Sequence, residues 1–207
     1  MKPQAPPINP ARFNNPLALK VAWTPNEYSG VRLRTHRLIQ PVPHRLEFRA
    51  CIKNYVIGAG MSLAGLAIMG VKLATVIFGT DKLDFTLPLV LLFGAAFVFF
   101  GIVILIVFTK PVVFDKHMGR AWSGREPPPD TKAATALNVP LNRIKAIQLV
   151  AESCSHKGGS FLSYELNVVL DDATRRTIID HGILGRVRQD AATLATFLGI
   201  PVWDAIE

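Results

Sequence analysis

The sequence lacks the motifs that mark an enzyme, a carrier or a cofactor protein. A metal site is not indicated, because Cys154 and His156 have no second Cys/His pair at ligand spacing. Gly58 to Gly60 lie inside an apolar run with no preceding strand, and the run from His156 to Ser160 lacks the spacing of a P-loop. No haem motif, dinucleotide fingerprint or transporter signature is present. We therefore expect a non-enzymatic protein that binds no cofactor and no metal.

One adjacent pair, Asp180 and His181, has the residue types of a catalytic base and the group that orients it. Neighbours on a strand point to opposite faces, however, and the pattern contains no matching nucleophile. We interpret the pair as a strand end that turns through Gly182.

A signal peptide and a disulfide are not indicated either. Residues 1–16 are rich in proline and asparagine and have no short apolar core, so we expect a flexible tail. Cys51 and Cys154 are expected to be free thiols in a reducing compartment. Reversible acylation is the alternative for Cys51, which lies four residues before an apolar run.

What the sequence does contain is two long apolar runs, Tyr55–Phe78 and Thr86–Phe108, joined by a short polar turn. At about 1.5 Å per helical residue they extend roughly 36 and 35 Å, enough to cross a hydrocarbon core of about 30 Å. We therefore predict a transmembrane helical hairpin over residues 55–109, with spans at 55–78 and 86–108.

Basic residues flank this predicted hairpin on both sides, in a chain of formal net charge +8. Cytoplasmic flanks of membrane spans collect Lys and Arg, whereas the connecting turn holds one lysine between two aspartates. We therefore expect a protein of the bacterial inner membrane with both termini in the cytoplasm. The basic residues nearest the spans are Arg45, Arg49, Lys53, Lys110, Lys116 and Arg120.

Small residues in the first run predict how the two helices pack. Gly58, Ser62 and Gly65 share one helical face, and Gly60 with Ala64 forms a neighbouring pair. Small residues at this spacing let helix backbones approach closely, so the predicted partner is the second helix of the hairpin. A homodimer face is the alternative.

Lys72 is the one charged residue of the first run. Intramembrane charges are candidates for function by default, but the side chain of Lys72 is long enough to reach the outer end of the helix. We expect it to meet Asp81 and Asp84 there.

Alternating residues predict β-strands over residues 17–54. Leu17–Trp23 alternates with a period of two, Val31–Arg37 follows with one basic face, and Leu46–Ala50 resumes the alternation after Pro41 and Pro43. These strands are too few to be stable alone. We therefore expect them to complete the domain formed by residues 110–207.

The C-terminal part predicts further strands and one helix. A hairpin over Val112–Phe114 and Trp122 is followed by strands at Leu141–Val150, Tyr164–Leu170 and Arg175–Ile179, with Glu152–Ser160 as a connection. An apolar stripe at steps of four, three and four predicts a helix over Leu184–Leu198, ended by Gly199 and Pro201. Trp203 and Ile206 are expected to pack back onto the sheet.

Several segments of the sequence resemble an uncharacterised family of small bacterial inner-membrane proteins. These segments are Trp23–Pro25, Arg34–His36, Phe114–Trp122, Val139–Leu141, Ile147–Gln148, Tyr164–Asn167, Asp180–Gly182, Asp190–Ala191 and Pro201–Asp204. The resemblance implies an α+β membrane protein, with a transmembrane hairpin and a cytoplasmic PH-like antiparallel β-domain capped by a C-terminal helix. Its motifs are structural, and the family brings no known activity.

The basic residues beside the spans are the feature from which a function is predicted. Near an anionic leaflet each can contribute about 1 kcal/mol, although the topology signal alone accounts for most of this charge. We expect a module that binds another protein or anionic lipid head groups, and no nucleic acid, because the positive charge is spread out. The alternatives are an immunity protein against a membrane-acting toxin and an accessory subunit of a larger membrane complex.

Overall fold

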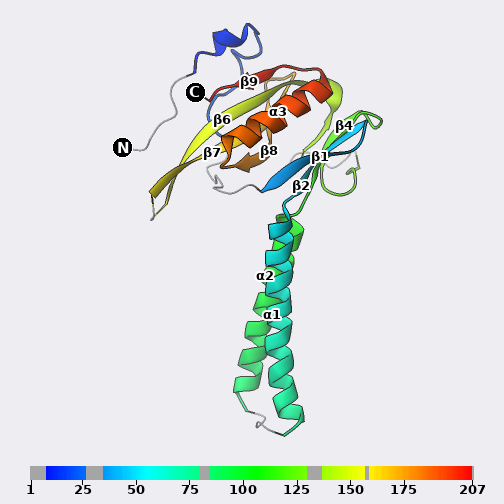
Figure 1. Cartoon of the computed structure of the whole chain (residues 1–207), viewed down its shortest axis with the longest axis vertical. Coiled ribbons are helices and arrows are strands. Elements are labelled where there is room, and N and C mark those ends of the chain that lie inside the picture. The colour runs from blue at the N-terminus through cyan, green and yellow to red at the C-terminus, as the bar shows by residue number, and fades with distance from the viewer. Residues whose placement is uncertain (1–7, 27–34, 80–83, 130–136, 157–158, 207) are drawn as a thin grey trace. The chain divides into compact units, whose positions relative to one another are not determined.

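The computed structural model describes residues 8–26, 35–79, 84–129, 137–156 and 159–206. The chain divides into two compact units, one formed by Met1–Arg49 with Pro111–Glu207 and the other by Ala50–Lys110 (Figure 1). The smaller unit interrupts the sequence of the larger one, so the larger unit contains chain from both sides of the insertion. Each unit is described separately below.

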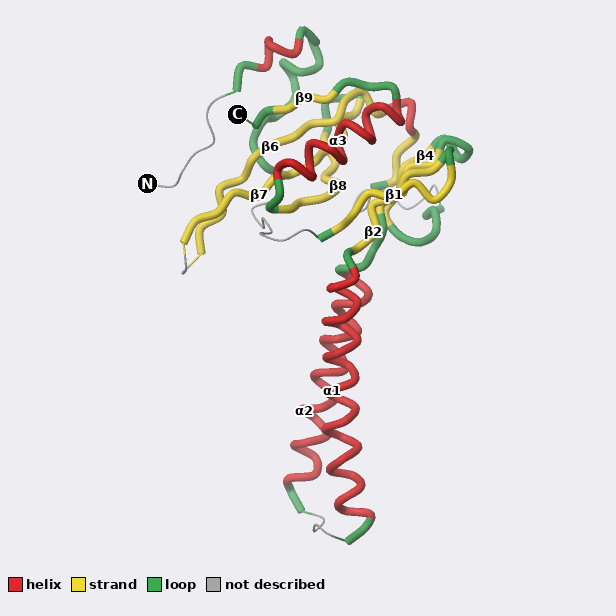
Figure 2. The backbone as a smooth tube through the Cα atoms, in the orientation of Figure 1, coloured by secondary structure: helices red, strands yellow, loops and turns green. Residues whose placement is uncertain are grey.

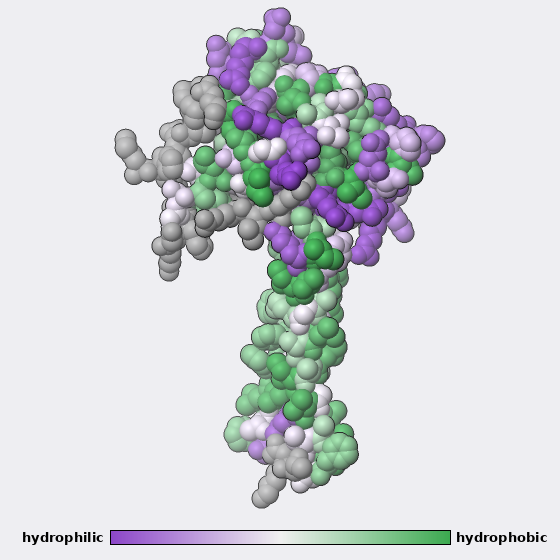
Figure 3. Space-filling model, viewed as in Figure 1, coloured by the Kyte–Doolittle hydropathy of each residue, from purple (hydrophilic) through white to green (hydrophobic). Residues whose placement is uncertain are grey.

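The smaller unit consists of α1 (Ile52–Ile77) and α2 (Thr86–Val107), both long and apolar enough to cross a membrane. The two predicted apolar helices are thereby confirmed as helices, with ends within three residues of the predicted ones. Figure 3 shows an apolar surface along the pair. Only 11% of the most apolar window of each helix is buried, whereas a core helix of a soluble protein would be mostly buried.

Four buried glycines form the contact between α1 and α2. They are Gly58 and Gly65 on the first helix and Gly94 and Gly101 on the second. A Cβ atom added at Gly65 would lie against the carbonyl oxygen of Gly94 and 2.9 Å from the backbone nitrogen of Val98. Backbone is thus packed on backbone, as the small residues predicted.

The other small residues of α1 divide between the two sides of the helix. Ser62 donates a hydrogen bond to the carbonyl of Gly58 at 3.1 Å, and a Cβ atom on Gly101 would meet its hydroxyl. Gly60 and Ala64 are exposed, and a Cβ atom on Gly60 would have no neighbour within 4 Å. Within the described chain, therefore, Gly60 and Ala64 make no helix contact of the kind that Gly58 and Gly65 make.

The larger unit contains two sheets and a C-terminal helix (Figure 2). The first sheet has the order β1-β2-β3-β4-β5, formed by His36–Val42, Arg45–Ala50, Val112–Asp115, Arg120–Ser123 and Asn138–Pro140. The second has the order β8-β7-β6-β9, formed by Arg175–His181, Gly159–Leu170, Ile144–His156 and Val202–Asp204. Helix α3 (Leu184–Leu198) packs on β6, β7 and β9, and its bounds are those predicted from the sequence.

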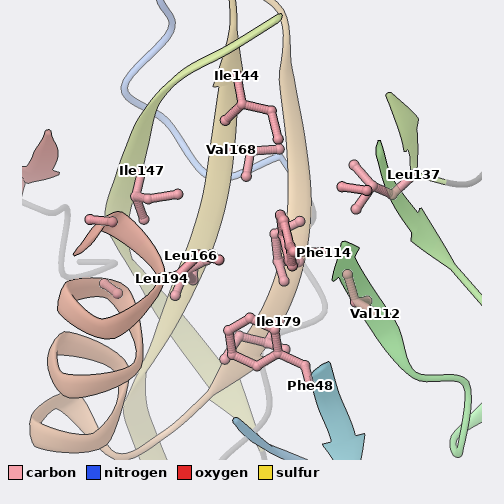
Figure 4. Close-up of a cluster of buried hydrophobic side chains, with 14 of the residues drawn as sticks. Phe48, Val112, Phe114, Leu137, Ile144, Ile147, Leu166, Val168, Ile179 and Leu194 are labelled. Carbon is pink, nitrogen blue, oxygen red and sulfur yellow. The ribbon is translucent and has the colours of Figure 1, made fainter. Parts of the chain in front are cut away.

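Strands from both sides of the helical hairpin share the first sheet. β2 pairs antiparallel with β3, with Leu46 opposite Phe114 and Phe48 opposite Val112. These side chains enter one core with Leu166 of β7 and with the buried stripe of α3 (Figure 4). The side chains of Phe48 and Phe114 meet edge to face with centroids 6.4 Å apart.

The predicted strand over Leu17–Trp23 is wrong, because residues 16–20 form turns. The side chain of Asn15 accepts a hydrogen bond from the Leu17 amide at 2.9 Å, which favours a turn over an extended chain. The apparent alternation is accidental: Leu19 is 63% exposed, whereas Ala18 and Val21 are buried.

The strand predicted over Val31–Arg37 falls largely on residues 31–34, which lie outside the described residues. The described strand β1 begins at His36 and runs through Pro41, which we expected to interrupt it. β1 is the outermost strand of its sheet, and an edge strand tolerates a proline because one row of its amides has no ladder partner.

Two predictions for the C-terminal part are also wrong. Leu141–Arg143 forms a 3-10 turn rather than the start of a strand, and most of Glu152–Ser160 belongs to the long hairpin of β6 and β7 instead of a connection. Glu152 is paired with Ser163, and His156 with Gly159. β9 was not predicted, but Trp203 and Ile206 are buried as expected.

Candidate functional site

Three of the six basic residues singled out above lie on one face of the first sheet. Residues two apart on a strand share a face, so Arg45, Glu47 and Arg49 of β2 point away from the core side chains Leu46 and Phe48. The strand register continues this outer face across the sheet. Its members are Arg45, Glu47 and Arg49 of β2, Val113 and Asp115 of β3, and Arg120 and Trp122 of β4.

Glu47 is the centre of this face. Its side chain is 6% exposed, and its carboxylate lies 2.6 Å from Nε of Arg45 through Oε1 and 2.6 Å from Nε of Arg49 through Oε2. One buried carboxylate therefore holds two guanidinium groups from the same strand. The contact of Arg49 is a charge-assisted hydrogen bond, whereas that of Arg45 is an ion pair without hydrogen-bond geometry.

Asp115 provides the second carboxylate of the face. It lies 3.9 Å from Arg45, and it also accepts hydrogen bonds from the amides of His117 at 2.8 Å and Met118 at 3.1 Å. These bonds close the turn between β3 and β4. The guanidinium of Arg45 in addition lies 5.4 Å from the ring centroid of Trp122, which is 1% exposed.

Arg49 is the member of the face that is best placed to bind an anion. Its side chain is 50% exposed, and its hydrogen bond to Glu47 is donated by Nε, one of the five N–H donors of a guanidinium group. Three arginines and two carboxylates give this face a net charge of about +1. A phosphate or carboxylate group fits such a fork in a bidentate manner.

The remaining candidate head-group contacts are not part of this face. Lys116 lies in the turn after β3, and its ammonium is 4.5 Å from the ring centroid of Phe197. Lys53 is in the first turn of α1 and Lys110 follows α2, so both belong to the smaller unit. The structure thus groups Arg45, Arg49 and Arg120, and Arg120 donates to the side chain of Asn138 at 2.7 Å.

Lys72 lies in a shallow apolar depression on the hairpin, lined by Ala67, Ile68, Val71, Thr75 and Val90. The pKa of Asp84 is lowered by hydrogen bonds from Thr86 and, to a smaller extent, by the positive charge of Lys72. Asp81, its other predicted partner, lies outside the described residues.

The two cysteines and the pair Asp180 and His181 were the other candidate residues in the sequence. Among the described residues Cys51 and Cys154 form no disulfide, and no cluster of three or more metal-ligating side chains occurs there. Asp180 accepts a hydrogen bond from the hydroxyl of Ser163, and Nδ1 of the buried His181 accepts the amide of Ile183 at 3.2 Å. Asp180 therefore bonds to β7, and His181 bonds to the backbone of Ile183 just before α3, in line with the interpretation as a strand end.

Sequence reasoning missed Glu47, Asp115 and Trp122 as members of the face. The signal available for Glu47 was its position between Arg45 and Arg49 at a spacing of two, which on a strand places all three on one side. Asp115 and Trp122 join the face only through the register of β3 and β4, which the local sequence does not predict. Comparison of the chain with known protein families, with curated proteins and with solved structures finds no match in any of the three.

Proposed function

We propose that this protein is a non-enzymatic, membrane-anchored module that binds the head groups of anionic lipids through the outer face of its first sheet. In this proposal α1 and α2 cross a bacterial inner membrane, and both termini are cytoplasmic. The exposed apolar surface of the two helices and the basic residues on their cytoplasmic flanks support this topology.

A PH-like fold for the larger unit is part of the proposal. Two sheets that share one core, followed by a helix that packs against the second sheet, are consistent with that outline. In the proposal the domain is completed by residues 17–54, because β1 and β2 precede the hairpin and β2 pairs with β3. The head-group site lies on the first sheet, on the side opposite this core.

The observation that carries the proposal is the carboxylate of Glu47 held between Arg45 and Arg49. A topology signal requires positive charge near a span but no defined geometry, whereas this pair of guanidinium groups is fixed by a buried acceptor. Arg49 is followed only by Ala50 and Cys51 before α1 begins at Ile52. Even an extended chain would keep its Cα within about 11 Å of that helix.

The test is the lipid composition that the full chain retains in nanodiscs of phosphatidylcholine and phosphatidylglycerol. For the wild type we expect native mass spectrometry to detect phosphatidylglycerol in excess over its share of the bilayer. Replacing Arg45, Arg49 and Arg120 with glutamine should abolish the excess, because each lost charge removes about 1 kcal/mol of attraction.

The control has the same change of charge at three exposed basic residues elsewhere in the larger unit, namely Lys145, Arg176 and Arg186. We expect this variant to retain the wild-type excess. Equal losses in the two triple variants would show that net charge alone attracts the lipid and would refute the proposed site.

The substitution Glu47→Gln distinguishes a binding site with defined arginine geometry from attraction of lipid by net charge alone. The substitution raises the net charge by one, so charge alone predicts more retained phosphatidylglycerol. In the proposed site the arginines lose their shared acceptor, and we expect the excess to fall about fivefold, as for the loss of roughly 1 kcal/mol. A greater excess in Glu47→Gln than in the wild type, in the same nanodiscs, would contradict this role of Glu47.

A further inference from the structure

The second sheet has an outer face of its own, which the proposed function does not use. Its inner face packs in the main core, with Ile147, Leu149, Leu166 and Val168 buried. Its outer face carries Ala146, Val169 and Trp203, and on these lies a segment from the start of the chain. We call residues 9–26 the N-terminal strap; Figure 1 shows it in blue near β9.

The apolar contact of the strap is small and largely aromatic. Ala18 and Val21 are its buried residues, and Phe13 stacks on Trp23 with centroids 4.9 Å apart. Both rings also contact Trp203, at 6.0 and 6.1 Å. A cover with so few buried apolar residues opens at a lower free energy than the core beneath it.

The strap makes polar contacts through side chains of Arg12 and Asn26 and also through two groups of its backbone. Nε2 of Gln148 donates to the carbonyl of Ala22 at 3.0 Å, and the amide of Asn26 donates to Oε2 of Glu165 at 2.8 Å. Gln148 is 0% exposed and Glu165 is 3% exposed. Recognition of a backbone carbonyl and a backbone amide does not depend on the side chains of the segment that supplies them.

The strap is held without joining either sheet. None of its residues belongs to a strand in the described part of the chain, and the ladder of β8, β7, β6 and β9 is complete without it. Its departure would therefore break no strand pairing. It would, however, expose Trp203 and leave Gln148 and Glu165 without their backbone partners, so the face would favour a replacement of the same chemistry.

We infer that the outer face of the second sheet is a peptide-docking surface that the N-terminal strap occupies in competition with a segment of a partner protein. The strap itself defines the chemistry of that segment. It is a peptide with turns that presents an aromatic side chain to Trp203, a backbone carbonyl to Gln148 and a backbone amide to Glu165. This surface is separate from the basic face of the first sheet, so it does not depend on lipid binding.

The test uses a fluorescent synthetic peptide with the sequence of residues 8–26 and the full chain in detergent. The receptor variant is Phe13→Ala/Trp23→Ala, which weakens the chain's own strap and leaves the sheet unchanged. We expect this variant to bind the peptide at least about tenfold more tightly than the wild type, because the internal competitor is weakened. A peptide of the same composition in scrambled order should not bind.

Equal affinity in the variant and the wild type, or equal binding of the scrambled peptide, would overturn the inference. A second measurement avoids reliance on the variant. In hydrogen exchange of the wild type, an excess of unlabelled peptide should speed the exchange of amides 10–26 and leave those of β6 and β7 unchanged. Strap amides that exchange only as slowly as β6, with or without peptide, would also overturn it.

Discussion

Replacing Gly65 with leucine is expected to force α1 and α2 apart. A Cβ atom at this position meets the Gly94 carbonyl and the Val98 amide, and these are backbone atoms that cannot rotate away as a side chain can. Overpacking a tight contact costs roughly 1–3 kcal/mol, and a leucine adds several atoms beyond Cβ. We expect the thermal unfolding midpoint of the chain in mild detergent, followed by circular dichroism of the helical signal, to fall by several degrees.

Gly60→Leu is the matched control for this prediction. It makes the same chemical change in the same helix, at a position where an added Cβ has no neighbour within 4 Å. Its midpoint should stay close to that of the wild type. If the two variants unfold at the same temperature, the glycine contact between the helices does not determine the stability of the hairpin.

Phe114→Ala is expected to destabilise the larger unit by about 3–5 kcal/mol, a large part of the stability of an ordinary domain. Phe114 is 0% exposed, and truncation leaves a cavity next to Phe48 and the core residues around it. The measurement is urea denaturation followed by the fluorescence of the buried Trp122 and Trp203. Leu162→Ala, at a side chain that is 49% exposed, serves as the control and should cost far less.

The same measurement also tests whether the strands before the hairpin belong to one folding unit with those after it. Phe48 lies in β2 and Phe114 in β3, with the helical hairpin between them in the chain. In a double-mutant cycle, residues in contact give non-additive losses. We therefore expect Phe48→Ala/Phe114→Ala to lose less stability than the sum of the single changes. Additive losses would indicate that the two strands fold independently.

The sequence patterns with many residues in a regular period predicted the structure well. The two apolar helices and α3 have long periodic signals and clear end signals, such as Gly199, whose φ of 72° favours glycine. The prediction of a strand over Leu17–Trp23 was wrong, because its alternation is short. The Asn15 side chain accepts a hydrogen bond from the Leu17 amide, and this bond favours a turn. The polar end of the β6–β7 hairpin was missed, because pairing between strands rather than burial explains it.

The candidate site was predicted only in part, for a similar reason. Position beside an apolar run was enough to select Arg45, Arg49 and Arg120, since charge near a span is a local property of the sequence. The acidic groups that orient them were not selected, because a glutamate in a strand is usually exposed to solvent. Glu47 is nevertheless buried, and its neighbours on the face include Val113 of β3, a residue on the other side of the hairpin in the chain.

The most direct test of the lipid-binding proposal is the identity of the lipid beside Arg49. A photo-reactive diazirine side chain at Ile52, which is 76% exposed and three residues after Arg49, gives lipid adducts that mass spectrometry identifies in bilayers of equal phosphatidylcholine and phosphatidylglycerol. We predict that phosphatidylglycerol dominates the adducts, and that this preference is lost when Glu47 is replaced with glutamine. Adducts that match the composition of the bilayer, with Glu47 present, would contradict the proposal.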